Sequence, residues 1–283
     1  MANQIHWFPG HMNKALHEVE EKVKMIDVII ELFDARAPLS SLNEHLEKAT
    51  SNKKKLYLIT KADLADPIQT PLWQKYLRNQ NSEVLVVDLT NKNSFKSISQ
   101  AVVKLGQSKW DRDMARGMKP QPIRTMIVGI PNVGKSSLIN RLAKRKAAGV
   151  QNKPGYTRGE QWIKVNKDFL LLDTPGILPM SYENQKKAAN LALIGAIRED
   201  ILPKEELGER LLEYLRNQYP SALSERFGIS VIEDRIKVLN QIAEKRKLVD
   251  SVGQNDLIRA EALLLKEFKD GLLGKITLEK YGA

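Results

Sequence analysis

The 283-residue chain contains no cysteine, so it has no disulfide, no thiolate metal site and no cysteine nucleophile. No apolar run approaches the roughly 18 residues that a membrane-spanning helix needs. The first residues, Met1–Trp7, show no basic start followed by an apolar stretch, which a secretory signal would have. We therefore expect a cytoplasmic protein that makes no use of a membrane. Hydrophobic residues form 42% of the chain and charged residues 28%, as in an ordinary globular protein.

Positive charge is concentrated in one part of the chain. The formal net charge is +11, and residues 101–170 hold 15 Lys and Arg residues against 4 Asp and Glu residues, an excess equal to that of the whole chain. A solvated basic surface is one interpretation of such a stretch. One triphosphate can occupy only a few of these charges, however, and the remainder favour a large polyanion such as nucleic acid.

Short apolar runs alternate with stretches of helical pattern over the first 180 residues. This alternation predicts an α/β fold with a parallel sheet that helices cover on both faces. The expected strands are 26–33, 56–60, 84–88, 125–130 and 169–173, and a further strand at 161–165 would form a hairpin with the last of these. The expected helices are 12–25, 42–50, 70–79, 94–108 and 135–145.

The pattern changes at two places. Residues 109–124 are polar and basic and include Gly117, Pro120 and Pro122, so we interpret them as a connector. After about residue 180 the strand pattern stops. Residues 1–180 are therefore predicted to form the α/β domain and residues 181–283 a helical domain. Its expected helices are 183–200, 204–218, 232–248 and 255–270.

The segment Gly129–Ser136 matches the phosphate-loop pattern G-x-x-x-x-G-K-[ST] without departure. An apolar run precedes it and a helical run follows, which is the order that the chemistry needs. Backbone N–H groups and the helix N-terminus would bind the phosphates. Lys135 would reach the β- and γ-phosphates, and Ser136 would be a ligand of Mg²⁺. The alternative is a Gly-rich turn before an ordinary helix. The expected nucleotide contacts in this loop are Asn132, Val133, Gly134, Lys135, Ser136 and Ser137.

Two segments downstream complete the predicted phosphate site. Asp173-Thr174-Pro175-Gly176 follows an apolar run, where nucleotide switch proteins place D-x-x-G. Asp173 would hold Mg²⁺ through water, and the N–H of Gly176 would contact the γ-phosphate. Thr157, in the basic loop between the two motifs, could complete the Mg²⁺ shell when the γ-phosphate is present. An ordinary turn and an ordinary hairpin loop are the alternatives.

The segment Thr60-Lys61-Ala62-Asp63 follows a predicted strand and approximates the N-K-x-D motif that reads guanine. Guanine offers two donors, N1–H and its exocyclic amine, to one carboxylate, and adenine does not. Asp63 would accept both, and the stem of Lys61 would cover the base. Thr60 replaces the usual asparagine, which weakens the expected hold on the loop. Asp88-Leu89-Thr90, after the next strand, would support the base, although it departs from the usual Ser-Ala-Lys.

The order of these motifs is reversed relative to an ordinary GTPase, because the guanine motif precedes the phosphate loop. Loops at the carboxyl ends of parallel strands meet in space whatever their order in the chain. The pattern therefore predicts a circularly permuted GTPase domain, with residues 109–124 as the new join. Because the Asp173–Gly176 segment leads directly toward the helical domain, nucleotide state would bias the position of that domain.

The permuted order, the phosphate loop, Asp173–Gly176, Asp34-Ala35-Arg36-Ala37-Pro38 and Trp7-Phe8-Pro9-Gly10-His11-Met12 together resemble the circularly permuted GTPases of ribosome assembly. The resemblance is to the ribosome biogenesis GTPase A family. It implies a GTP- and GDP-binding cytoplasmic factor that matures the precursor of the large ribosomal subunit, contacts ribosomal RNA and is stimulated by the ribosome. We expect the protein to be monomeric.

The same resemblance supplies the remaining catalytic residues. Many GTPases orient water with a glutamine directly after D-x-x-G, but this chain has Ile177 there. The family's candidate for that role is the histidine of the N-terminal motif, which is His11 here. An ordinary cap or surface histidine is the alternative. In related GTPases an asparagine at the position of Asn132 helps to hold K⁺ beside the β- and γ-phosphates, so K⁺ is expected beside Mg²⁺.

Two other classes of function stay open on the sequence alone. One is an RNA-binding placeholder protein whose nucleotide sets affinity with negligible turnover. The other is an ATPase, or a GTPase that acts on another polyanion such as a membrane surface. Asp63 argues against the ATPase, and turnover with and without large-subunit particles separates the placeholder from the enzyme.

Overall fold

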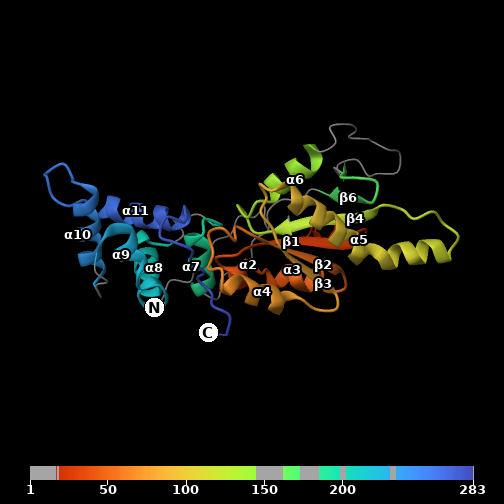
Figure 1. The fold of residues 1–283 in the computed structure, drawn as a ribbon, viewed down its shortest axis with the longest axis horizontal. Coiled ribbons are helices and arrows are strands. Elements are labelled where there is room, and N and C mark those ends of the chain that lie inside the picture. The colour runs from red at the N-terminus through yellow and green to blue at the C-terminus, as the bar shows by residue number, and fades with distance from the viewer. Residues whose placement is uncertain are drawn as a thin grey trace.

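The structure is a computed structural model that describes residues 17, 19–144, 162–172, 185–197, 202–229 and 234–282. Its centre is a six-stranded sheet in the order β3-β2-β1-β4-β6-β5 (Figure 1). All neighbouring strands are parallel except β5 and β6. The strands are β1 (Val28–Asp34), β2 (Lys54–Thr60), β3 (Ser82–Val86), β4 (Ile123–Gly129), β5 (Trp162–Lys164) and β6 (Phe169–Leu172).

The two strands at the middle of the sheet, β1 and β4, bring the predicted motifs together. Every residue of β1 is buried, because helices cover both faces of a mainly parallel sheet. The register sets Asp34 at the end of β1 opposite Thr60 at the end of β2, and Leu32 opposite Gly129 at the end of β4. The predicted parallel sheet and its circularly permuted motif order are confirmed.

The edge of the sheet is the predicted hairpin. Strands β5 and β6 are antiparallel, with Trp162 opposite Leu172. The side chain of Asn166 accepts hydrogen bonds from the backbone N–H groups of Asp168 and Phe169, at 2.7 and 3.0 Å. This local turn explains why a three-residue polar segment between two apolar runs was sufficient to predict the pair.

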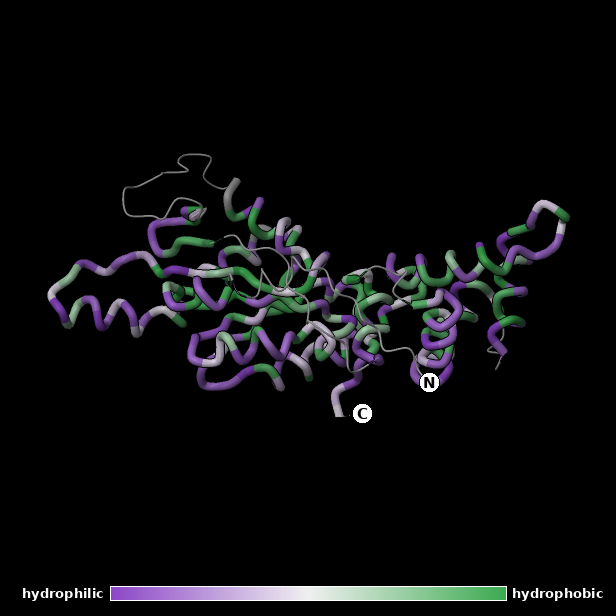
Figure 2. Tube along the Cα trace, turned by 180° about the vertical axis from the view of Figure 1, so that it is seen from behind, coloured by the Kyte–Doolittle hydropathy of each residue, from purple (hydrophilic) through white to green (hydrophobic). Residues whose placement is uncertain are grey.

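Helices cover the two faces of the sheet with different apolar residues. On one face, Ile98 and Val102 of α5 and Leu138 of α6 join the core that includes Ile30 of β1. On the other face, Val19 and Val23, which precede β1, and Leu46 of α3 belong to the cluster that contains Ile29. Figure 2 shows the hydrophobic residues concentrated in the strands. The helices of this half are α2 (Pro38–Ser41), α3 (Glu44–Ala49), α4 (Gln69–Leu77), α5 (Lys92–Ala115) and α6 (Lys135–Lys144).

The second half of the described chain is helical. Helix α11 packs against α7, α8 and α10, and this group lies to the left of the sheet in Figure 1. The apolar residues of the group join the same core as the α5 face of the sheet. The helices are α7 (Gln185–Leu193), α8 (Lys204–Gln218), α9 (Ala222–Phe227), α10 (Arg235–Arg246) and α11 (Leu257–Lys269). The expected domain boundary at residue 180 lies outside the described residues.

The interpretation of residues 109–124 as a connector is wrong for its first half. Helix α5 continues for 24 residues to Ala115, and its far end projects beyond the sheet at the right of Figure 1. The ion pair between Lys109 and Asp113, four residues apart, supports the extra turns. The helix ends before Gly117, which has a φ of +71°. Residues 109–115 contain no glycine or proline, and the connector prediction rested on their polar composition alone.

Candidate nucleotide site

The phosphate loop connects β4 to α6 in a conformation that needs its glycines. Gly129 has a φ of +144° and Gly134 a φ of +107°, and Asn132 between them has a φ of +57°. A Cβ atom on Gly134 would lie 2.6 Å from the side chain of Leu89. The loop therefore passes close to the predicted base-supporting segment, and α6 begins immediately afterwards at Lys135. This arrangement turns backbone N–H groups and a helix N-terminus toward one space.

Lys135 is buried and lies back over its own loop. Its ammonium group donates to the carbonyl oxygens of Gly129 and Ile130, at 3.2 and 3.0 Å. The cation is thus held at the loop by neutral acceptors. Ser136 and Ser137, which follow it in the first turn of α6, are exposed. Their hydroxyls are accessible to phosphate oxygens and to a metal ion.

A cleft of about 470 Å³ joins the phosphate loop to the guanine motif. The two motifs lie more than 60 residues apart in the chain, and the sheet brings them to one edge, as the topology of parallel strands predicts. The volume is in the range of sites for nucleotide-sized ligands. The lining residues are Thr60, Lys61, Asp63, Val87, Asp88, Leu89, Thr90, Asn132, Val133, Gly134, Ser137, Asn140 and Arg141.

Thr60 ties the guanine motif to the phosphate loop although it replaces the usual asparagine. Its hydroxyl lies 2.9 Å from the carbonyl oxygen of Val133 and 2.9 Å from that of Phe33. A hydroxyl has one proton, so it donates to one of these two acceptors at a time. Threonine therefore retains a direct link between the two loops, which an asparagine amide would make with two donors.

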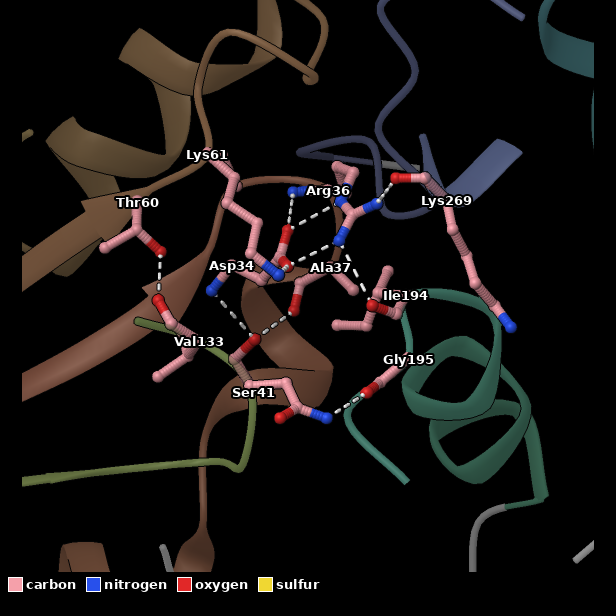
Figure 3. Close-up of polar contacts among 12 residues, drawn as sticks. Asp34, Arg36, Ala37, Ser41, Thr60, Lys61, Val133, Ile194, Gly195 and Lys269 are labelled. Carbon is pink, nitrogen blue, oxygen red and sulfur yellow. Dashed lines mark hydrogen bonds and ion pairs between the residues drawn. The ribbon is translucent and has the colours of Figure 1, made fainter. Parts of the chain in front are cut away.

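Lys61 is held at the cleft by a buried carboxylate. Its φ is +56°, and its ammonium nitrogen lies 2.9 Å from an oxygen of Asp34. Arg36 donates to both oxygens of the same carboxylate, at 3.0 and 2.8 Å (Figure 3). Burial alone would raise the pKa of Asp34, but the hydrogen bonds and charge of Arg36, together with Lys61, hold that pKa below its ordinary value. Asp34 is therefore ionised and fixes the stem of Lys61.

Arg36 also joins the sheet to the helical half. Its guanidinium donates to the carbonyl oxygen of Ile194, directly after α7, at 3.1 Å, and to that of Lys269, the last residue of α11, at 3.0 Å (Figure 3). The phosphate loop has its own link, because the amide nitrogen of Asn132 donates to the carbonyl oxygen of Gly195 at 2.8 Å. Sequence reasoning used Arg36 only as a mark of resemblance and missed this role. The sequence signal that could have indicated this role is the pair of opposite charges, Asp34 and Arg36, at the end of an apolar strand.

The residues after α11 return to the guanine motif. The backbone N–H of Ile276 donates to the carbonyl oxygen of Leu64 at 3.1 Å. Asp66 donates its backbone N–H to the hydroxyl of Thr277, also at 3.1 Å. The loop that carries Asp63 is thus supported by backbone contacts from the far end of the chain, which no sequence motif indicated.

The base-supporting segment is shaped by local hydrogen bonds. Asp88 accepts from the hydroxyl and the backbone N–H of Thr90, at 2.6 and 2.7 Å, and these bonds lower the pKa of the Asp88 carboxyl. Leu89 lies against the phosphate loop at Gly134. Arg141 of α6, which sequence reasoning did not nominate, lines the cleft and donates to the carbonyl oxygen of Thr90 at 3.1 Å.

Several predicted site residues lie outside the described residues. They are His11, Thr157, Asp173 and Gly176, and Ile177 lies there as well. Of the predicted Mg²⁺ ligands, only Ser136 is described. Within the described ranges, no three His, Asp or Glu side chains cluster in the way that a metal site needs. The Ser136 hydroxyl, at the start of α6, suits a hard cation whose other ligands include phosphate oxygens.

Comparison with known proteins places this site in a family. The chain is 41% identical over 276 residues to ribosome biogenesis GTPase A of Bacillus cereus, covering 97% of this chain and 93% of the relative. It is 40% identical over 277 residues to the protein of the same name from Bacillus pumilus, covering 98% of each. This chain belongs to the ribosome biogenesis GTPase A family.

Further comparisons support the assignment to the ribosome biogenesis GTPase A family. A family model described as "50S ribosome-binding GTPase" matches residues 124–222. The crystal structure of GNP-bound YlqF from T. maritima superposes with a TM-score of 0.69 at 25% sequence identity, covering 94% of this chain and 98% of that one. Residues 124–222 include the phosphate loop and continue into the helical half. In the described part of this family member, no helix is both long and apolar enough to cross a bilayer.

Proposed function

We propose that this chain binds GTP, hydrolyses it to GDP and phosphate, and acts in the assembly of the large ribosomal subunit. One observation carries the proposal most directly. The cleft is lined by Asp63 of the guanine motif and by the phosphate loop, although a long stretch of sequence separates them. Membership of the ribosome biogenesis GTPase A family gives the reaction and the cellular process.

Recognition of guanine is assigned to the residues at one end of the cleft. The Asp63 carboxylate would accept the N1–H and the exocyclic amine of the base. Lys61, whose ammonium group is paired with Asp34, keeps its stem in place to cover one face of the ring. Leu89 is positioned to contact the base from the neighbouring segment. The proposed nucleotide contacts are Thr60, Lys61, Asp63, Asp88, Leu89, Asn132, Val133, Gly134, Lys135, Ser136, Ser137 and Gly176.

Hydrolysis requires charge neutralisation at the phosphates and a positioned water molecule. Lys135 supplies the protein's positive charge, and Mg²⁺ would be held by Ser136 together with Thr157 and Asp173. Bound by these residues, the metal would neutralise negative charge on the phosphates during hydrolysis. His11 is proposed to position the water, because Ile177 has no polar group for that task. Asn132 is proposed to hold K⁺ through its amide oxygen.

An exchange at Asp63 tests guanine recognition without removing the phosphate site. Xanthine carries an oxygen at C2 where guanine carries an amine, so an amide donor at residue 63 matches xanthine and mismatches guanine. Asp63→Asn is expected to weaken GTP binding about 100-fold or more, from the loss of two charge-assisted hydrogen bonds, and to favour XTP. Asp111→Asn, on the exposed part of α5, is the matched control and should change neither. Unchanged GTP binding in Asp63→Asn would refute the assignment.

The partner is proposed to be ribosomal RNA in a precursor of the large subunit. The projecting end of α5 supports a polyanion as partner, because Arg112, Arg116 and Lys119 are exposed there. Asp113, in the same segment, is engaged by Lys109 and by the backbone N–H of Gln121. Electrostatic binding to RNA phosphates weakens steeply with salt. Charge reversal at Arg116 and Lys119 is therefore expected to reduce co-sedimentation with large-subunit particles and to flatten its salt dependence.

The same particles distinguish the enzyme from a placeholder. A GTPase of ribosome assembly should hydrolyse GTP faster when large-subunit precursors are present. A placeholder would bind the particles in a nucleotide-dependent way with turnover unchanged. The protein is further proposed to be a cytoplasmic monomer, with a GTPase domain at residues 1–180 and an RNA-binding helical domain at residues 181–283.

A further inference from the structure

A second cavity of about 470 Å³ lies away from the nucleotide cleft, between α4 and the segment that follows α11. Three aromatic rings form one of its walls. The ring of Trp73 makes edge contacts with those of Tyr76 and Tyr281, with centroids 5.6 and 5.7 Å apart, and the two tyrosine rings are 5.5 Å apart. Tyr76 is 55% exposed and Tyr281 45% exposed, whereas Trp73 is buried.

The wall is fixed by hydrogen bonds between segments far apart in the sequence. The indole N–H of Trp73 donates to the carbonyl oxygen of Glu279 at 2.8 Å. The backbone N–H of Tyr281 donates to the side chain of Gln69 at 2.8 Å. The rings are therefore preorganised, and little conformational entropy would be lost on binding. Large exposed aromatic side chains held in this way are unusual on a surface that has no ligand.

The charges around the cavity are mostly positive. Lys186, Lys187 and Lys280 line it, with one carboxylate, that of Glu279. That carboxylate is turned away to other donors, since it accepts from the backbone N–H groups of Leu39 and Ser40, at 2.6 and 3.0 Å. Lys187 is itself paired with Glu44, at 2.9 Å. The residues that line the cavity carry three positive charges and one negative charge, so its lining is positive on balance.

We propose that this cavity binds an unpaired nucleobase of single-stranded RNA, with Tyr76 and Tyr281 as the stacking platform and the lysines at the flanking phosphates. Aromatic faces next to basic side chains are how proteins bind single strands. Bases in a duplex are already stacked and paired, so they cannot enter a cavity of this kind. The inference rests on the proposed action on ribosomal RNA and adds a specific place and a specific RNA conformation to it.

The test measures the affinity of the full chain for a short single-stranded RNA oligonucleotide by fluorescence anisotropy, with the same oligonucleotide annealed to its complement as comparison. Each stacking ring is worth about 1–3 kcal/mol, or about 5- to 150-fold in affinity. Tyr76→Ala and Tyr281→Ala should each weaken single-strand binding by such a factor. Tyr76→Phe and Tyr281→Phe keep the ring and should stay within about 2-fold of the unmodified chain.

Two further measurements separate this inference from the function on which it rests. Intrinsic GTP hydrolysis should be unchanged in all four variants, since none removes a residue of the nucleotide cleft. Lys186→Gln should lower the dependence of single-strand binding on salt by about one phosphate contact. Equal losses in the Phe and Ala variants, full affinity in the Ala variants, or a duplex bound as tightly as the single strand would each overturn the inference. Absence of GTP hydrolysis in the unmodified chain would instead overturn the proposed function.

Discussion

Replacing Arg36 by methionine should destabilise this protein more than any exchange at a surface ion pair. The two side chains of the pair with Asp34 are 3% and 1% exposed. Methionine approximates the aliphatic part of arginine and removes the guanidinium. The Asp34 carboxylate then stays buried with Lys61 as its remaining charged partner, and the carbonyl oxygens of Ile194 and Lys269 lose a donor.

The magnitude follows from the cost of removing one partner of a buried ion pair, typically about 3–5 kcal/mol. Because Lys61 lies 2.9 Å from Asp34 and still compensates part of its charge, we expect a loss near the lower end of that range. Arg210→Met is the matched control, because Arg210 also donates twice to one carboxylate, that of Glu206, at 3.1 and 2.8 Å. That pair is partly exposed, with side chains 33% and 39% accessible, and its loss should cost about 1 kcal/mol or less.

Urea unfolding followed by circular dichroism measures both variants. The pH dependence gives a second readout. The folded-state pKa of Asp34 is lowered, so its contribution to stability is present above the unfolded pKa of about 3.9 and is lost as pH falls through the folded value. Without Arg36 that pKa rises toward the unfolded value, so acidification below about pH 3.9 should remove less stability from Arg36→Met than from the unmodified chain. A free energy loss in Arg36→Met no larger than in Arg210→Met would refute the reasoning.

Three further predictions concern single side chains. Burial and the neighbouring carboxylate of Glu47 raise the pKa of Glu31 well above its usual value, so its contribution to stability falls as pH rises above about 4.3. The stability of Glu31→Gln relative to the unmodified chain should therefore increase with pH in urea unfolding at pH 5, 6 and 7, and an equal difference at all three would contradict this. Thr60→Val removes the donor to Val133 and should weaken GDP binding about 5- to 10-fold, with Thr60→Ser close to normal, as measured with a fluorescent GDP analogue. Asn132→Ala removes the donor to Gly195 and the proposed K⁺ ligand, so turnover in K⁺ should fall to its level in Na⁺; a retained K⁺ advantage would count against that role.

The sheet was predictable because its strands carry their own signal. The run that became β1 is apolar except for Glu31 and Asp34, because both of its faces are covered, and the helical patterns between the strands favoured a parallel arrangement. The helix at 204–218 was predicted at its observed bounds. The far end of α5 was not, because it is largely exposed apart from Trp110, which packs against the core; it therefore shows no apolar period and resembles a polar loop.

The same distinction applies to the nucleotide site. The proximity of Thr60, Asp63 and the phosphate loop could be predicted from the sequence, because parallel strands end at one edge of a sheet. The contacts of Arg36 with Ile194 and of Ile276 with Leu64 could not, because their acceptors are backbone carbonyl oxygens. Every residue has such an oxygen, so no residue type marks the position. Only the path of the chain decides which carbonyl a donor reaches.

The amide of Asn132 has a consequence for how far this fold can be divided. Its nitrogen is committed to Gly195, so the planar amide group has one orientation, and its oxygen must face the opposite way. A shortened chain ending before Gln185 would contain every nucleotide motif in the sequence. It would nevertheless lack Gly195, the acceptor of Asn132, and two of the acceptors of Arg36, Ile194 and Lys269, and the amide of Asn132 would be free to rotate. The half that carries the nucleotide motifs can be recognised from the sheet topology, yet on its own it would not keep the phosphate-loop geometry of the full chain.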